Sequence, residues 1–213
     1  MNEEINNSIN KLYEIFSNVP RPVKIDACPC CVDKKQIFTL LNKQLREITP
    51  DEMSGYASSV FLTAGSENDF RYFLPRILDI LINNSGWWPD PEIIGRAMQS
   101  YGWNRFTENE QSAISNFFDS VLITDINSPD SDGDFINTWL CTVSYFYPDW
   151  DKYLEIITKK PKALVSLYEC HSNTLMRNKL SDGFWNDSPK DQEFINWINS
   201  DKIKSLIKNA YGL

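Results

Sequence analysis

Three of the five cysteines of this chain lie together, in the segment Cys28-Pro29-Cys30-Cys31. Thiolates bind soft metals, but a structural zinc site needs four ligands whose spacing closes a tetrahedron. Only three thiols are present here, two of them adjacent, and the single histidine, His171, is far away in the sequence. Redox-active pairs are usually separated by two residues and open a helix. We therefore expect a structural loop without metal or cofactor, and metal-binding or enzymatic use of Cys28, Cys30 and Cys31 is the alternative hypothesis.

His171 is the only imidazole available to any acid–base mechanism. It follows Cys170 directly, and adjacent residues of a helix point about 100° apart, so these two cannot form a dyad. The chain also contains no glycine-rich phosphate loop, no Gly-x-Ser-x-Gly turn and no His-Glu-x-x-His pair. We expect His171 to be structural and the protein to be non-enzymatic.

Acidic side chains gather in one region, at Asp125, Asp130, Asp132 and Asp134. Oxygen ligands at alternate positions are typical of a calcium loop, but an EF-hand requires glycine at its sixth position and glutamate at its twelfth. Counting from Asp130, those positions are Phe135 and Cys141. The pattern therefore favours an acidic turn that caps the following helix, and its four carboxylates are candidate partner contacts.

The segment Trp87-Trp88-Pro89-Asp90 is predicted to lie in a turn between two helical pairs. Aromatic side chains in such turns either pack between helices or anchor a partner protein, where tryptophan is enriched. Two adjacent tryptophans cannot both point the same way, so one is expected in the core and the other at the surface. Trp87, Trp88 and Asp90 are therefore also candidate contacts.

Composition restricts the partners. The chain has 213 residues, a net charge of -8 and a pI near 4.7, which argues against direct nucleic-acid binding and against an anionic membrane surface. A basic protein is the natural complement. No leader and no apolar run long enough for a bilayer is evident, which predicts a cytoplasmic protein.

The elements that position these residues are helical. Residues 3–17 have apolar side chains at the spacing of one helix face, residues 18–33 are interrupted by three prolines, and residues 34–41 predict a short helix. From residue 49 onward, capping signals recur about every 40 residues, at Thr49-Pro50, Asp90-Pro91 and Ser131-Asp132.

Two amphipathic stretches follow each capping signal. The first pair is expected over residues 49–64 and 67–84, with a hinge at Gly65-Ser66 and a kink at Pro75, and Thr107 with Glu110 predicts a capping box. The sequence therefore predicts an all-α fold of stacked antiparallel helical hairpins in a single domain, residues 1–213. Residues 1–48 would hold the first helix, the Cys/Pro loop and the short helix, and residues 49–213 the hairpin array.

Helical pairs of this period resemble HEAT and armadillo arrays. Over residues 49–200, the helix count, size and charge are also similar to the all-helical, HEAT-like immunity proteins of bacterial contact-dependent growth inhibition. That resemblance implies an immunity protein that neutralises a basic toxin domain, often a nuclease, by covering its active site with an acidic surface.

Overall fold

The chain folds into helices joined by turns, as the sequence predicts. The computed structural model describes residues 2–212, and this part of the chain contains no strand, only two isolated bridges that involve Ala27, Val60 and Ala64. No helix among these residues has both the length and the apolar character needed to cross a bilayer. The all-α class is therefore confirmed.

Contacts gather into two compact units, Met1–Phe117 and Phe118–Leu213, whereas the sequence suggested one domain with a subdivision near residue 48. The boundary between the units falls inside helix α6. The first unit contains α1 (Glu3–Ile15), η1 (Phe16–Asn18), α2 (Lys34–Asn42), η2 (Leu45–Glu47), α3 (Pro50–Ser59), α4 (Glu67–Asn83), α5 (Pro91–Tyr101), η3 (Trp103–Arg105) and the first part of α6 (Glu108–Ile126). The second contains the rest of α6, α7 (Gly133–Ser144), α8 (Lys152–Thr158), α9 (Pro161–Leu175), η4 (Gly183–Asp187), α10 (Asp191–Ile198) and α11 (Asp201–Ala210).

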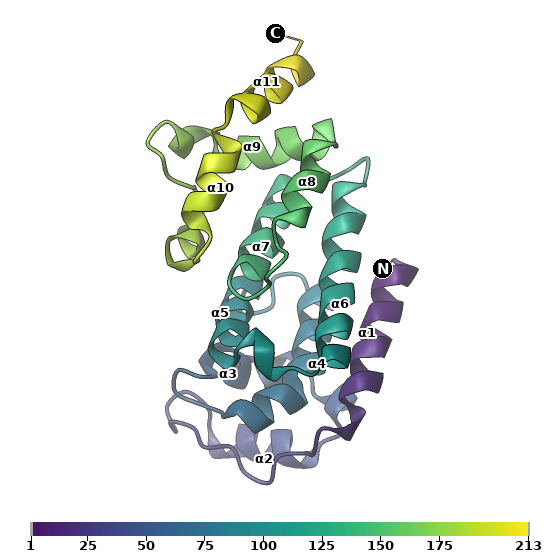
Figure 1. The fold of residues 1–213 in the computed structure, drawn as a ribbon. Helices are drawn as coiled ribbons and strands as arrows, with labels where there is room; N and C mark the ends of the chain where they lie inside the picture. The colour runs from purple at the N-terminus through teal and green to yellow at the C-terminus, as the bar shows by residue number, and fades with distance from the viewer. Residues whose placement is uncertain (1, 213) are drawn as a thin grey trace. The chain divides into compact units, whose positions relative to one another are not determined.

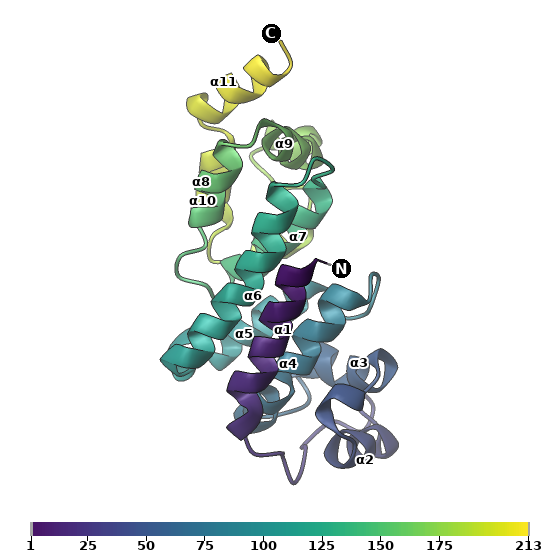
Figure 2. The same ribbon diagram turned by 90° about the vertical axis from the view of Figure 1, so that its right-hand side faces the viewer.

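Within the first unit, α1 packs against α4 and α2 against α3 (Figures 1 and 2). The capping box predicted at Thr107 is present, since the Thr107 hydroxyl accepts from the Glu110 N–H (3.3 Å), and the capping signal at Thr49 also forms a box, in which the Thr49 hydroxyl accepts from the Glu52 N–H (3.3 Å). Pro75 lies inside α4, which continues past it to Asn83. These helices begin where they do for local reasons, because each capping side chain pairs with a backbone N–H group that the first turn leaves without a partner.

The predicted end of the first hairpin helix is wrong. Helix α3 ends at Ser59 and does not continue to Ala64. Phe61 has a left-handed backbone (φ 62°), and Ala64 instead forms a bridge with Ala27. The phenyl ring of Phe61 packs edge-on against Phe70 (5.1 Å between centroids), so tertiary contacts override the helical pattern of this segment.

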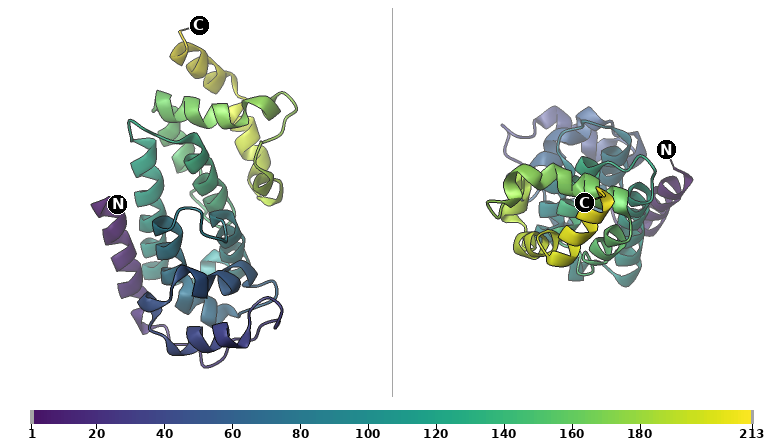
Figure 3. Two further views of the ribbon diagram at one scale, coloured as in Figure 1. Left: turned by 180° about the vertical axis from the view of Figure 1, so that it is seen from behind. Right: turned by 90° about the horizontal axis from the view of Figure 1, so that it is seen from above.

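Within the second unit, α9 lies across the N-terminal end of α7 (Figure 3) and is a closer neighbour of α7 than the following helix α8. The core contains stacked aromatic rings: Trp185 and Phe194 lie 4.5 Å apart, and Phe194 and Trp197 5.5 Å. The Trp185 indole N–H donates to Asn137 Oδ1 (2.8 Å). The stacking of hairpins into a HEAT-like array stays a prediction.

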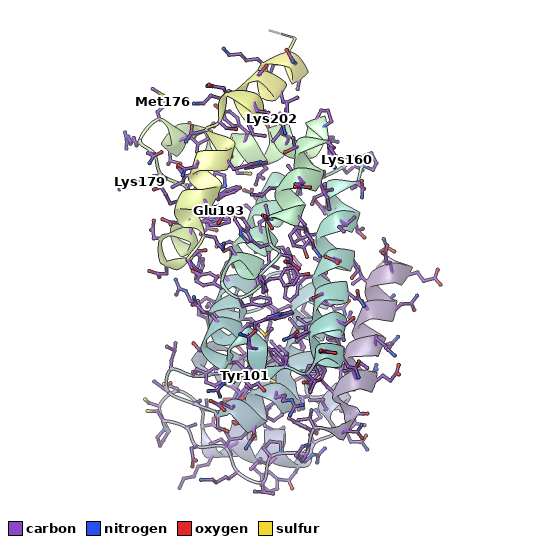
Figure 4. The ribbon with its side chains drawn as sticks, viewed as in Figure 1. Tyr101, Lys160, Met176, Lys179, Glu193 and Lys202 are labelled. Carbon is purple, nitrogen blue, oxygen red and sulfur yellow. The ribbon has the colours of Figure 1, made fainter. Side chains whose placement is uncertain are left out.

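Methionines occupy opposite environments. Met53 on α3 and Met98 on α5 are fully buried, whereas Met176, just beyond α9, is 97% exposed (Figure 4).

Candidate functional site

The four predicted acidic residues lie at the junction of α6 and α7, which we call the acidic loop (Asp125, Asp130, Asp132 and Asp134). Two of them hold the loop in place. Asp125 Oδ2 accepts from the Ser131 hydroxyl (3.3 Å) and from the Asp132 N–H (3.1 Å), while Asp132 Oδ1 accepts from the Asp134 N–H (3.0 Å) and caps α7. The predicted helix cap is therefore confirmed at Asp132.

The other two carboxylates are more available to a partner. The Asp130 side chain is 97% exposed, and its nearest cation, Lys162 Nζ, is 3.8 Å away. Asp134 is also exposed and interacts with the thiol of Cys170, whose pKa is raised to about 12 by burial first and by this hydrogen bond second. The exposed ion pair between Asp130 and Lys162 contributes little to stability, so Asp130 can exchange Lys162 for a cation of a partner.

Asp125 differs from the exposed carboxylates. It is half-buried, and this burial raises the pKa of its carboxyl group, although the hydrogen bonds from Asp132 and Ser131 oppose the shift. Burial disfavours the charged form because the low-dielectric surroundings solvate it poorly. Asp125 thus acts mainly on the shape of the acidic loop.

Gly133, within the acidic loop, allows the start of α7 to approach the backbone of α9 closely. A Cβ at this position would lie 2.2 Å from the carbonyl oxygen of Ser166 and 2.7 Å from the sulfur of Cys170. The Ser166 hydroxyl also donates to the Ser131 carbonyl (3.4 Å). The first turn of α7 is therefore fixed against the backbone of α9 at a distance that only glycine permits.

The charge around the acidic loop extends further along the chain than the sequence reading recognised. Residues 118–151 carry seven carboxylates and no lysine or arginine: Asp119, Asp125, Asp130, Asp132, Asp134, Asp149 and Asp151. Among the ion pairs of the described residues, two of these carboxylates have a cation: Asp119 has Lys152 Nζ at 2.7 Å, and Asp130 has Lys162 Nζ at 3.8 Å. The missed signal was the absence of basic residues between Arg105 and Lys152.

The two tryptophans differ in exposure as expected, although Trp87 is half-buried and does not belong to the core. The Trp87 indole N–H donates to the carbonyl of Pro50 (2.9 Å), which holds this ring against α3, whereas Trp88 is 56% exposed. The Trp88 carbonyl accepts from the Ser54 hydroxyl (2.6 Å), which fixes the backbone below the exposed ring. Asp90 is exposed at the N-cap position of α5 but makes no capping hydrogen bond. Trp88 is the ring that a partner could contact.

A groove of about 670 Å³ in the second unit was not predicted. Leu154, Trp197 and Leu206 give it an apolar lining, while Glu193 and Lys202, labelled in Figure 4, lie at α10 and α11. Its residues come from α8 and its ends and from the consecutive helices α10 and α11, which follow much later in the sequence. Helical spacing assigns each of them to a helix face but does not show which faces meet.

The cysteine segment is more organised than its spacing suggested. Cys28 Sγ and Cys30 Sγ lie 2.7 Å apart, Cys30 Sγ and Cys31 Sγ 3.8 Å, and all three sulfurs lie within 4.8 Å of one another. The spacing alone did not indicate this proximity, which arises because the backbone turns tightly between the cysteines. Among the described residues, these three cysteines form a group whose ligand atoms lie close enough together to share one metal ion.

His171 is fully buried, which the sequence did not indicate. The Ser181 N–H donates to Nδ1 (3.2 Å), while Nε2 has no hydrogen-bond partner in the described part of the chain. Burial lowers the pKa of His171 to about 4, against the opposing charges of Asp182 and Asp134. The imidazole of His171 is therefore enclosed by the fold and neutral at pH 7.

Comparison of the chain with protein-family models, with curated proteins and with solved structures found no match. The function proposed next therefore rests on the residues and contacts of this chain.

Proposed function

We propose that this protein is a non-enzymatic immunity protein that binds and neutralises a basic toxin domain, such as a nuclease, in the cytoplasm. The observation that carries the proposal is the segment 118–151, which has seven carboxylates and no lysine or arginine of its own, with Asp130 and Asp134 exposed. Clustered negative charge of this kind complements the basic surface with which a nuclease holds phosphate.

In this proposal, the charge of the acidic loop sets the association rate and an aromatic anchor sets the dissociation rate. The carboxylates of the acidic loop speed the encounter, because complementary charge raises association rates by about 10- to 1000-fold. An exposed aromatic ring that enters a pocket of the partner lengthens the life of the complex. Trp88 is the candidate anchor, and its backbone is already fixed by Ser54. Inhibition would follow when carboxylates occupy the positions of substrate phosphates.

The structure indicates which aspartates can be changed without disturbing the fold. Asp125 and Asp132 hold the acidic loop and cap α7, so their reversal would confound binding with stability. The test variant is therefore Asp130→Lys with Asp134→Lys. The control is Asp191→Lys with Asp201→Lys, which changes the net charge equally in the first turns of α10 and α11.

The partner to test is the product of the adjacent gene, with kinetics measured by surface plasmon resonance over a salt series. We expect the acidic-loop variant to associate about tenfold more slowly at low salt and the control to change much less. The difference should shrink as salt shortens the Debye length below about 10 Å. Equal association rates for the two variants would exclude the acidic loop as the contact surface, and no binding at all would remove the proposal.

Trp88→Ala tests the anchor separately. If Trp88 is a hot spot, we expect dissociation to accelerate and binding to weaken by about 2 kcal/mol or more, with little change in the association rate. Trp87→Phe is the control, since that ring packs on α3. Unchanged dissociation in Trp88→Ala would remove Trp88 from the interface.

Stoichiometry separates occlusion from enzymatic inactivation. A protein that covers an active site inhibits only while bound, so toxin activity should fall linearly and reach its minimum near one chain per toxin. Complete inactivation by a small fraction of one equivalent would identify an enzyme and contradict the non-enzymatic proposal.

A further inference from the structure

The cysteine segment forms a closed turn. The carbonyl of Cys28 accepts from the Cys31 N–H (2.9 Å) and from the Val32 N–H (3.1 Å). The chain therefore makes a single helix-like turn between the first and the last cysteine, which brings the three sulfur atoms together. We call this segment, residues 28–31, the cysteine turn.

Contacts on both sides fix the cysteine turn. On one side, the Cys28 N–H donates to the Thr63 carbonyl (2.8 Å), and the Gly65 N–H donates to the Asp26 carbonyl (2.9 Å). On the other side, Val32 is 1% exposed, and Asp33 caps α2 by accepting from the Gln36 N–H (2.7 Å). These contacts fix the backbone of the turn and leave the exposed Cys30 side chain able to rotate.

Helix α3 also approaches the cysteine turn closely. A Cβ on Gly55 would lie 3.1 Å from the Cys31 carbonyl oxygen and 2.6 Å from Oε1 of Gln36. Gln36 Nε2 in turn donates to the Glu52 carbonyl (3.1 Å). The turn thus rests on the folded body of the first unit, while Cys30 itself is exposed and open to an incoming ion.

The sulfur spacing suits a small thiolate site. Around an ion with metal–sulfur bonds of about 2.3 Å, ligand sulfurs lie about 3.8–4.0 Å apart. The Cys30–Cys31 distance of 3.8 Å already matches, whereas Cys28 and Cys30, at 2.7 Å, must separate by about 1 Å on binding. Rotation of the exposed Cys30 side chain can supply that change. No fourth His, Cys, Asp or Glu joins the cluster among residues 2–212.

We propose that Cys28, Cys30 and Cys31 bind one Cu(I) ion through three thiolates. Thiolates are soft ligands that select Cu(I), and three sulfurs without a fourth protein ligand suit a three-coordinate ion better than tetrahedral Zn(II). On binding, three copper–sulfur bonds form, three S–H bonds break and three protons pass to solvent. The oxidation states of copper and sulfur do not change.

Each of the three cysteines is a free thiol in the metal-free chain and must lose its proton to become a ligand. Binding should accordingly weaken as pH falls, because the ligands must be deprotonated.

The test uses the full chain, reduced under anaerobic conditions and shown to have five free thiols before titration. Cu(I) is delivered from its complex with bicinchoninate, a competing chelator. We expect one equivalent to bind, about three protons to be released per ion, and X-ray absorption to show a shell of three sulfurs. Cys30→Ser should reduce affinity at least about tenfold.

Cys170→Ser is the matched control, because this thiol lies outside the cluster and a hydroxyl can keep its hydrogen bond to the Ser166 carbonyl. It should bind Cu(I) like the unmodified chain, and circular dichroism checks that both variants are folded. Absence of 1:1 binding, or equal affinity in Cys30→Ser, would overturn the proposal. A parallel titration in which Zn(II) binds at the same cysteines and Cu(I) does not would overturn the choice of ion.

Discussion

At the scale of single residues, Gly133 offers the sharpest test of packing. We expect Gly133→Ala to destabilise the protein by about 2 kcal/mol or more, because the added methyl group meets the backbone of Ser166, which cannot rotate away. Urea unfolding measures the loss. Gly183→Ala is the control, since a Cβ there meets nothing within 4 Å. Equal midpoints for the two variants would contradict the close contact between α7 and α9.

His171 predicts a pH dependence of stability. Its folded pKa of about 4 lies below the usual 6.5, so the unfolded chain binds the proton more readily between these values. The contribution is therefore fully present above pH 6.5 and is lost as pH falls toward 4. Between pH 7 and 5 we expect a loss of about 2 kcal/mol.

Urea unfolding at both pH values measures this loss, and His171→Gln provides the comparison. With the only imidazole removed, the variant should be less stable at pH 7 but should lose much less stability on going to pH 5. A nuclear magnetic resonance titration that shows His171 protonated near pH 6.5 would refute the expected shift.

At the scale of elements, the start of α6 depends on its capping box. We expect Thr107→Ala to cost about 1 kcal/mol, because the Glu110 N–H loses its acceptor. Thermal unfolding measures the change. Thr39→Ala is the control: its hydroxyl bonds back to the Lys35 carbonyl inside α2, where alanine is a good helix former, so little or no loss should follow. Similar losses for both would argue against the cap.

Helix starts could be predicted because their causes are local. Thr49, Thr107 and Asp132 each satisfy backbone groups within three residues, and the sequence shows this directly. The end of α3 could not be predicted, because it depends on distant contacts: Phe61 packs against Phe70, and Ala64 forms a bridge with Ala27. The position of the cysteine turn depends on the segment after α3 as well, because the Cys28 N–H donates to the carbonyl of Thr63.

The candidate site was predicted in part. Asp130 and Trp88 are exposed, as a contact requires, while Asp125, Asp132 and Trp87 serve the fold. Residue type alone could not separate these roles, because an aspartate that caps a helix and one that faces a partner look alike in a sequence. The groove beside Trp197 was missed because α8 forms it together with α10 and α11, which lie much further along the chain.

At the scale of the whole molecule, the net charge of -8 predicts that the chain does not bind nucleic acid directly. We expect no rise in fluorescence anisotropy of labelled duplex DNA with the chain at about 0.1 M salt. The lysines of α11 could still attract phosphate, so a variant with Lys202, Lys204 and Lys208 changed to Gln serves as the comparison. A rise that salt and this variant both abolish would contradict the prediction and locate a basic contact at α11.

Because the methionines differ in burial, their oxidation can report local unfolding of the first unit. Peroxide converts accessible thioethers to sulfoxides and spares those enclosed by packing. In the native state, Met176 should therefore gain oxygen first, while Met53 and Met98 stay unmodified until the first unit opens. Peptide mass spectrometry after brief exposure would then show, from a single sample, whether a variant or a bound partner has loosened that unit.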